Sequence, residues 1–298
     1  MRLRKAFAAT TAGIAIAAGL AACGDAGGSD DEGRDVDAKS DCDKKFDEGS
    51  RMAELAKAGT INVGHKTDQP GVGFQGATDD VPKGFDIEIA KLLIADLCID
   101  PASDKVNWEE TISDNREPYL ESGKVDIVLA SYSITDDRQK VVGQAGPPYM
   151  VTGQQVLVKE DSDVTGIDDL KGKEVCSVTG STSLENVKAK GAKGVGADSY
   201  SECAEKVLDG TYEAMSTDGT ILAGLAAQNE GQLKVVGDQF STENIGVGYG
   251  KDHPEMCEWI DGVLKAAFED GSWAEAFELT LGPSGVETPE PPTLQPCK

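Results

Sequence analysis

The chain has 298 residues, of which 39% are hydrophobic and 27% are charged, and this composition is typical of a globular protein. Its 28 basic and 53 acidic residues give a formal net charge of −25, which argues against a partner with a phosphate backbone, such as a nucleic acid. The sequence has only two histidines, so most histidine-based catalytic triads and multi-histidine metal sites are excluded. We expect neither a metal nor a cofactor.

The first 22 residues have the pattern of a secretory signal peptide. A short basic region, residues 1–5, precedes an uncharged stretch, residues 6–22. This stretch is too short and too weakly apolar for a membrane-spanning helix. Leu20-Ala21-Ala22-Cys23 resembles a bacterial lipobox, which implies that Cys23 is lipidated and anchors the protein to the outer face of the cell membrane. The alternative is an ordinary signal peptide followed by a chance cysteine.

Residues 24–40 carry six acids, two bases and few apolar side chains. This composition cannot form a core, so residues 23–41 are predicted to be a lipidated cysteine followed by a disordered acidic tether. Six cysteines follow, and an even number in an exported chain indicates disulfides. None of them shows C-x-x-C spacing, which argues against zinc binding and thioredoxin-like chemistry.

Helical and strand patterns alternate along the rest of the chain. In chain order they predict a helix at 50–58, a strand at 60–64, a helix at 86–97, a strand at 105–108, a helical turn at 116–122 and strands at 125–130 and 154–159. A second run follows, with a strand at 174–178, helices at 182–190 and 200–208, a strand at 213–217, a helix at 221–228, strands at 233–236 and 244–249, and helices at 254–269 and 272–279. Two such runs predict an α/β protein with two lobes.

The segment from Gly71 to Gly76 matches the pattern G-x-G-x-x-G of dinucleotide-binding proteins. It is followed by turn residues and Pro82 instead of a helix, so we reject a dinucleotide site.

The most informative stretch follows the buried strand 125–130. Ligands of α/β sheets bind beyond the carboxyl ends of strands, and Ser131, Ser133 and Thr135 place hydroxyl groups there. Thr135-Asp136-Asp137 is predicted to begin a helix whose free N–H groups suit an anion. Arg138 can bind a carboxylate through two hydrogen bonds. The alternative is that Arg138 pairs with Asp136 or Asp137.

Residues 115–149, the segment 84–90 (GFDIEIA) and the closing helix pair together resemble the periplasmic-type solute-binding proteins for polar amino acids, over nearly all of residues 60–281. Asp68-Gln69-Pro70-Gly71 resembles actinobacterial glutamate-binding lipoproteins more narrowly. The resemblance implies a type II periplasmic-binding-protein-like fold, with two α/β sheets joined by a two-crossing hinge. It also implies a monomeric receptor, not an enzyme, which binds free L-glutamate and delivers it to the permease subunits of an ABC importer.

The resemblance further implies a ligand clamped between the lobes. Arg138 and Thr135 would bind the α-carboxylate, and Ser133 and the Ser131 region would contact the α-ammonium. In the second lobe, Asp218 would be the counter-charge of the ammonium, its alternative role being the N-cap of the helix 221–228. The loop that would offer a further carboxylate site consists of Ser181, Thr182 and Ser183.

The ligand side chain is expected to contact the loop after the first strand. A buried γ-carboxylate needs a cation or several donors, for which Lys66, Thr67 and Gln69 are candidates. Lys66 is equally consistent with a surface lysine. Phe74 is the aromatic residue of this loop, although it comes later than the family pattern implies.

The expected crossings divide the chain into 42–150 (lobe 1), 151–247 (the crossings and lobe 2) and 248–298 (the rest of lobe 1). Cys176 and Cys203 are then the pair in lobe 2. For lobe 1 we expect Cys42–Cys98 and Cys257–Cys297, the alternative being pairings that join the amino and carboxyl segments.

Three other functions remain open. The same receptor fold could bind glutamine, aspartate or a basic amino acid. A cyclohexadienyl-dehydratase-like enzyme on this scaffold would need a general acid or base in the cleft, for which Asp68 is the candidate. An amino-acid sensor would pass its signal to a partner kinase.

Overall fold

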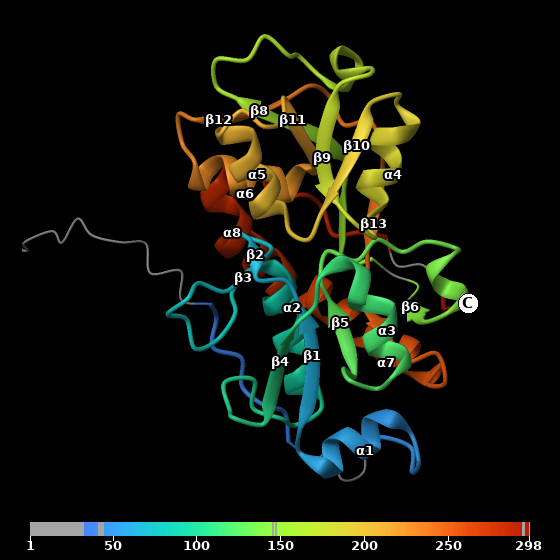
Figure 1. Ribbon diagram of the computed structural model, residues 1–298. Helices are drawn as coiled ribbons and strands as arrows, with labels where there is room; N and C mark the ends of the chain where they lie inside the picture. Colours follow the sequence, from blue (N-terminus) through green and yellow to red (C-terminus); the bar gives the residue numbers. More distant parts are fainter. Residues whose placement is uncertain (1–32, 41–44, 145, 147, 294–295, 298) are drawn as a thin grey trace, which may run out of the picture. The chain divides into compact units, whose positions relative to one another are not determined.

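The computed structural model describes residues 33–40, 45–144, 146, 148–293 and 296–297 (Figure 1). The predicted signal peptide, the lipidation of Cys23 and the Cys42–Cys98 pairing depend on residues outside this described part. None of the described helices is both long enough and apolar enough to cross a membrane.

Lobe 1 is built on a five-stranded sheet with the order β4-β1-β5-β14-β6. Strand β1 lies between β4 and β5 and is parallel to both, and β14 runs antiparallel to β5 and β6. The strands are β1 (Ile61–His65), β4 (Val106–Glu110), β5 (Ile127–Leu129), β6 (Gly143–Gln144) and β14 (Gly248–Tyr249). The helices of this lobe are α1 (Arg51–Ala58), α2 (Phe85–Asp96), α3 (Arg116–Glu121), α7 (Glu255–Asp270) and α8 (Ser272–Leu281).

Lobe 2 is built on a second five-stranded sheet with the order β10-β9-β11-β8-β12. Strand β9 is parallel to β10 and β11, whereas β8 is antiparallel to β11 and β12. The strands are β8 (Gln154–Lys159), β9 (Glu174–Val178), β10 (Lys193–Ala197), β11 (Ala214–Asp218) and β12 (Leu233–Val236). The helices are α4 (Thr182–Ala189), α5 (Tyr200–Leu208) and α6 (Gly219–Gln228).

Two antiparallel strands connect the lobes. The chain leaves lobe 1 through β7 (Met150–Thr152) and returns through β13 (Glu243–Ile245). Figure 1 shows β13 between the two groups of strands. The predicted fold of two α/β lobes is therefore confirmed. The remaining short elements are the hairpin β2 (Asp68–Gln69) and β3 (Gly73–Phe74), and the 3-10 turns Ser113–Asn115, Arg138–Lys140, Ile167–Leu170 and Gly282–Ser284.

Local sequence signals explain where helices begin and end. Ser50 caps α1 by accepting the N–H of Ala53, and Gly59 ends it with φ of 66°. Helix α2 begins differently from the helix predicted at 86–97, because its N-cap is Gly84, with φ of 116°. A methyl group on Gly84 would lie 2.5 Å from the Val72 backbone, so only glycine fits there.

Asp86, which the sequence pattern places at the cap of that helix, is fully buried in its first turn instead. Its carboxylate accepts hydrogen bonds from the Ser131 N–H at 2.7 Å and the Tyr149 hydroxyl at 2.8 Å. Burial raises the pKa of Asp86 to about 6, against the effect of these two bonds. Asp86 thereby ties α2 to the end of β5, where the candidate site begins.

Two disulfides join the described residues. Cys176–Cys203 links β9 to α5 within lobe 2, and Cys257–Cys297 links α7 to the carboxyl-terminal tail. These are two of the three pairings expected from the sequence.

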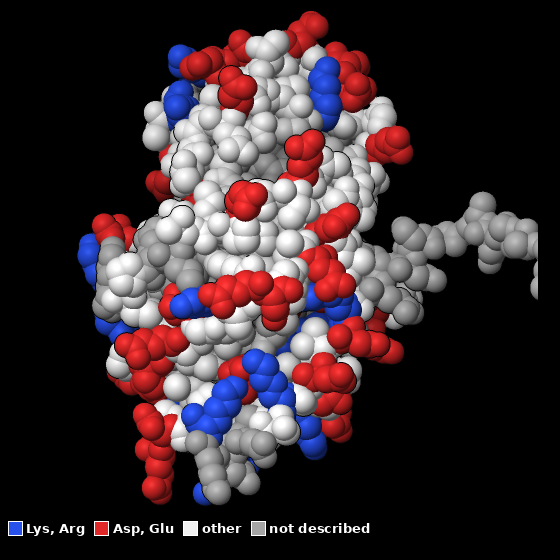
Figure 2. Space-filling view, turned by 180° about the vertical axis from the view of Figure 1, so that it is seen from behind, with Lys and Arg blue, Asp and Glu red and all other residues white. Residues whose placement is uncertain are grey.

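Residues 33–40, the described part of the predicted tether, lie against lobe 1. Arg34 pairs with the buried Glu88 of α2 at 3.1 Å, and Lys39 pairs with Asp96 at 2.8 Å. The chain therefore joins lobe 1 along α2 before α1 begins. On the face shown in Figure 2, acidic side chains are widely spread and basic ones lie singly or in small groups, as the net charge of −25 leads one to expect.

Candidate ligand-binding site

Polar side chains from both lobes meet where β5 and β11 end and α4 begins. They enclose a space of about 10 Å³, in which at most a single water molecule fits. The lobes must therefore separate before an amino acid can enter. The lining residues are Ser113, Arg116, Ser131, Ser133, Arg138, Ser181, Thr182, Ser183, Tyr200 and Asp218.

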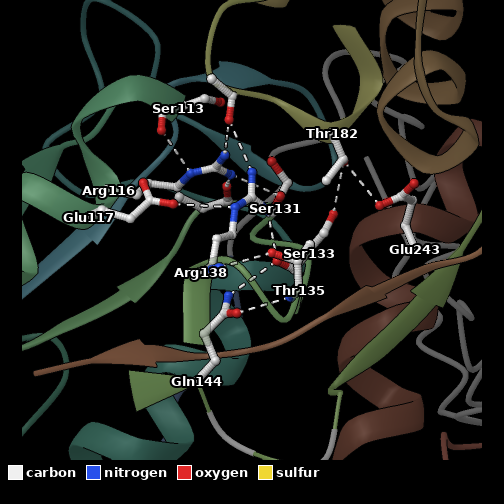
Figure 3. Close-up of polar contacts among 12 residues, drawn as sticks. Ser113, Arg116, Glu117, Ser131, Ser133, Thr135, Arg138, Gln144, Thr182 and Glu243 are labelled. Atoms are coloured by element: carbon white, nitrogen blue, oxygen red, sulfur yellow. Dashed lines mark hydrogen bonds and ion pairs between the residues drawn. The ribbon is translucent and has the colours of Figure 1, made fainter. Parts of the chain in front are cut away.

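Arg138 lines this space, as the sequence predicts. It does not pair with Asp136 or Asp137, which was the alternative considered from the sequence. Its guanidinium donates to the Ser133 carbonyl at 2.7 Å and to the Gly180 carbonyl at 3.0 Å. Its Nε lies 3.3 Å from the carboxylate of Glu117 (Figure 3). Asp137 pairs with Lys140 instead. Arg138 is therefore directed into the site and is not held at the surface by its sequence neighbours.

Arg116, the first residue of α3, is a second cation of the site, which the sequence analysis did not identify. It is fully buried, and all its hydrogen bonds to described residues go to backbone carbonyls: Ser113, Ala130, Ser131 and Gly180. Burial, and then the charge of Arg138, lower the pKa of Arg116 to about 10. A buried guanidinium that is bonded to neutral carbonyls can gain much from an anionic ligand.

The Gly180 carbonyl of lobe 2 accepts hydrogen bonds from both guanidinium groups of lobe 1, at 3.1 Å from Arg116 and 3.0 Å from Arg138. Both guanidinium groups also lie over the Tyr132 ring, at 4.5 and 4.8 Å from its centre. Figure 3 shows them side by side. A carbonyl oxygen that receives two cationic donors marks where a carboxylate oxygen would be bound more strongly.

Asp218 is the carboxylate of the site, at the end of β11. It is buried, and its Oδ1 has no hydrogen-bond partner among the described residues. Although it precedes α6, its side chain makes no capping hydrogen bond, contrary to the alternative role considered from the sequence. Burial, reinforced by the charge of Glu243, raises the pKa of Asp218 to about 8. Asp218 therefore has no ion-pair partner among the described residues, and the ammonium of a ligand would supply one.

The raised pKa of Asp218 predicts how stability depends on pH. The folded protein keeps a proton that the unfolded chain releases near pH ~4, so the free energy of unfolding falls between about pH 4 and pH 8. Asp218→Asn should remove this fall, on the order of a few kcal/mol, and raise the Tm of the ligand-stripped protein at pH 8 much more than at pH 4. Thermal unfolding at both pH values checks this, and an equal difference at both would contradict it.

Lys66 is buried and is not a surface lysine. Its Nζ donates to the Ser113 hydroxyl at 2.9 Å, and Ser113 in turn lines the enclosed space. Burial, and then the charge of Arg116, lower the pKa of Lys66 to about 7. A carboxylate bound beside Ser113 would favour the charged form of Lys66.

The four predicted serines and Thr182 line the space. Ser131 has a left-handed backbone conformation, with φ of 44°, and turns its carbonyl toward Arg116. The Ser133 and Thr182 hydroxyls lie 3.4 Å apart across the lobes, and Thr182 donates to Glu243 of β13 at 3.0 Å. Ser181 caps α4 by accepting the Leu184 N–H, and Ser183 lies 3.2 Å from the Thr217 hydroxyl.

Five predicted ligand contacts are not among the lining residues: Lys66, which touches the lining residue Ser113, and Thr67, Gln69, Phe74 and Thr135. Thr67 donates its hydroxyl to Glu110 at 2.7 Å. Thr135 donates its N–H to Gln144 and accepts the Arg138 N–H, because the predicted helix is only a single 3-10 turn at Arg138–Lys140. Phe74 pairs its backbone with Lys83, away from the space. Gln69 is fully buried, and neither of its amide atoms has a hydrogen-bond partner among the described residues.

Sequence reasoning also missed Ser113 and Tyr200. Tyr200 follows Ser199, which caps α5, so its position in a helical first turn was readable but its orientation toward lobe 1 was not. For Arg116 the one available signal was a cation in the first turn of a helix, where acids are favoured.

The fold and the site together define a two-lobed protein with a small polar space enclosed between its lobes. The model of the bacterial extracellular solute-binding proteins, family 3, matches residues 61–281, and the chain belongs to this family. The resemblance to solute-binding proteins seen in the sequence is thereby confirmed.

Individual relatives support this membership. The glutamate-binding protein GluB of Corynebacterium efficiens is 36% identical over 245 residues, 78% of this chain and 83% of that protein. The ABC transporter glutamine-binding protein GlnH of Bacillus subtilis is 31% identical over 76% of this chain and 83% of its own length. A solved ancestral amino acid-binding protein, AncCDT-1, a precursor of cyclohexadienyl dehydratase, superposes with a TM-score of 0.70 at 32% identity, over 78% of this chain and 100% of that chain.

Proposed function

We propose that this protein binds L-glutamate between its two lobes. The observation that carries the proposal is the presence of two guanidinium groups, Arg116 and Arg138, opposite the unpartnered carboxylate of Asp218. Glutamate has two carboxylates and one ammonium, so its charges complement these three groups one for one. The name of the relative from Corynebacterium efficiens supports the same ligand.

The position of each ligand group follows from the contacts. Arg138 binds the α-carboxylate and Asp218 the α-ammonium, because both lie at the strand ends where the two lobes meet. Arg116 receives the γ-carboxylate, with Ser113 and Lys66 beside it. The Gly180 carbonyl gives way to the ligand's carboxylates, which are stronger acceptors.

Glutamine is disfavoured by the same contacts. Its side-chain amide would turn an NH₂ donor toward a region that already holds the donors of Arg116 and Lys66. Discrimination then comes from a repulsive contact with the wrong ligand as well as from the attraction of the right one.

We further propose that the protein is lipid-anchored through Cys23 at the outer face of the cell membrane and acts as a monomer. It delivers the bound amino acid to the permease subunits of an ABC importer. The signal pattern of residues 1–23 and the name of the Bacillus subtilis relative support this. We propose no catalytic step, because Asp218, the buried acid of the site, is the counter-charge of the ligand's ammonium.

Titration calorimetry on ligand-stripped protein tests the proposal. We expect L-glutamate to bind about 10- to 100-fold more tightly than L-glutamine, because a hydrogen bond to a charged group contributes about 1.5–3 kcal/mol. L-Aspartate should bind more weakly than L-glutamate because it is one methylene too short to reach both guanidinium groups. L-Arginine should not bind. Equal affinity for L-glutamate and L-glutamine, or no binding at all, would contradict the proposal.

A further inference from the structure

The turn formed by Asp68, Gln69, Pro70 and Gly71 belongs to lobe 1 but contacts lobe 2. Asp68 accepts the backbone N–H of Tyr200 at 2.6 Å and that of Ser201 at 3.4 Å. These are the first two residues of α5. Figure 1 shows the β2 hairpin directly beside α5 and α6, and the backbone contacts of β2 with both helices agree with this view.

The backbone N–H groups in the first turn of α5 find hydrogen-bond acceptors in both lobes. Within lobe 2, the Ser199 hydroxyl accepts the Glu202 N–H. From lobe 1, the Asp68 carboxylate accepts hydrogen bonds from the N–H groups of Tyr200 and Ser201. The first turn of a helix leaves N–H groups without helical partners and carries partial positive charge, so a carboxylate is the favoured acceptor there.

A second contact places the same turn against α6. The Pro70 carbonyl oxygen lies so close to Gly224 that any side chain at Gly224 would overlap it. The turn itself needs Gly71, which has φ of 78° and leaves no room for a side chain beside the Thr280 carbonyl. The turn and lobe 2 therefore fit closely together. None of the four turn residues lines the ligand space, although the charge of Asp68 acts on Lys66.

We infer that Asp68 is a clasp that holds the two lobes closed around the bound amino acid. It is a positioning residue, because it does not line the ligand space, whereas Tyr200, whose N–H it accepts, does. The identity of the bound amino acid rests on the proposed function, whereas the contact between Asp68 and α5 does not. The clasp exists only while the lobes are closed, so its loss accelerates opening and ligand release and leaves ligand capture by the open form unchanged.

Asp79 provides a matched control. It lies on the same connection of lobe 1, and its carboxylate also accepts a backbone N–H, that of Gly76 at 3.0 Å. The same carboxylate forms an ion pair with Lys83 at 3.7 Å. Both of these contacts lie within lobe 1. Removing this carboxylate tests the loss of a loop-stabilising acid without the loss of a contact between lobes.

The first measurement is the release of radiolabelled L-glutamate into an excess of unlabelled ligand. We expect Asp68→Ala to raise the dissociation rate about 10- to 100-fold, because a hydrogen bond to a charged group contributes about 1.5–3 kcal/mol. Its association rate should change less than about twofold. Asp68→Asn keeps an acceptor oxygen and should show a smaller rise, whereas Asp79→Ala should match the wild type. An unchanged dissociation rate in Asp68→Ala would overturn the inference, and Asp68→Asn serves in its place if the alanine variant does not fold.

The second measurement follows the clasp itself in the closed form. Amide hydrogen exchange in protein saturated with L-glutamate, or with L-glutamine if L-glutamate does not bind, should become at least ~10-fold faster at Tyr200 and Ser201 in Asp68→Ala and stay unchanged at Glu202. Unchanged exchange at Tyr200 would overturn the clasp. If the wild type fails to bind L-glutamate while Tyr200 responds in this way, the proposed ligand is wrong and the clasp stands.

Discussion

Arg116→Gln is expected to lower the affinity for L-glutamate about 100-fold or more and to leave the affinity for L-glutamine within about fivefold. The substitution removes the charged partner proposed for the γ-carboxylate, and the lost charge-assisted bonds are worth about 1.5–3 kcal/mol each. Glutamine has no γ-carboxylate and loses little. Calorimetric titration of both amino acids into the wild type and the variant gives the ratio of affinities directly.

The ratio also separates a specific effect from damage to the fold. Arg116 donates to the backbone carbonyls of Ser113, Ala130 and Ser131, so its replacement is expected to lower the Tm as well. A general loosening of the site would weaken both ligands equally. Parallel losses for L-glutamate and L-glutamine would therefore refute the assignment of Arg116 to the ligand side chain.

Arg138→Ala should weaken every α-amino acid ligand by about 100-fold or more. Arg138 is assigned to the α-carboxylate, which all these ligands share, and a two-bond guanidinium–carboxylate contact is lost. Removal of the guanidinium also leaves Glu117 without its ion-pair partner beside the site, which adds repulsion for an anionic ligand.

Glu117→Gln is the matched control for this effect. It breaks the same ion pair but keeps Arg138, so its binding of L-glutamate should stay within about fivefold of the wild type. Unchanged affinity in Arg138→Ala, or an equal loss in Glu117→Gln, would show that Arg138 does not hold the ligand.

The two-lobed fold could be predicted because most of its elements have strong local patterns. The apolar run before Ser131 indicates β5, and Ser50 and Gly59 delimit α1. The elements that were not predicted are those in which polar and apolar residues show no regular spacing. Strand β10 has the sequence KGVGA, with two glycines in five residues, and β2 and β3 have two residues each, so neither alternation nor a hydrophobic face can be recognised.

The candidate site was predictable where a strand end by itself marks a functional position. Arg138 follows β5, and Asp218 ends β11. Arg116 was not predictable, because its burial depends on carbonyls 14, 15 and 64 residues further along the chain. Thr135 shows the opposite error, since its N–H is taken by Gln144, nine residues away.

Lys66 shows why burial has to be observed. Its sequence neighbours suit a surface loop equally well, but its ammonium reaches Ser113, 47 residues away, in the interior. Contacts made at such distances along the chain arise from the packing of elements and leave no local trace in the sequence.

A crystal structure of the ligand-stripped protein soaked or co-crystallised with L-glutamate tests the central claim most directly. We expect the α-carboxylate on Arg138, the ammonium on Asp218 and the γ-carboxylate on Arg116, with the Gly180 carbonyl displaced from both guanidinium groups. A γ-carboxylate that lies away from Arg116, or an ammonium that makes no contact with Asp218, would contradict the account.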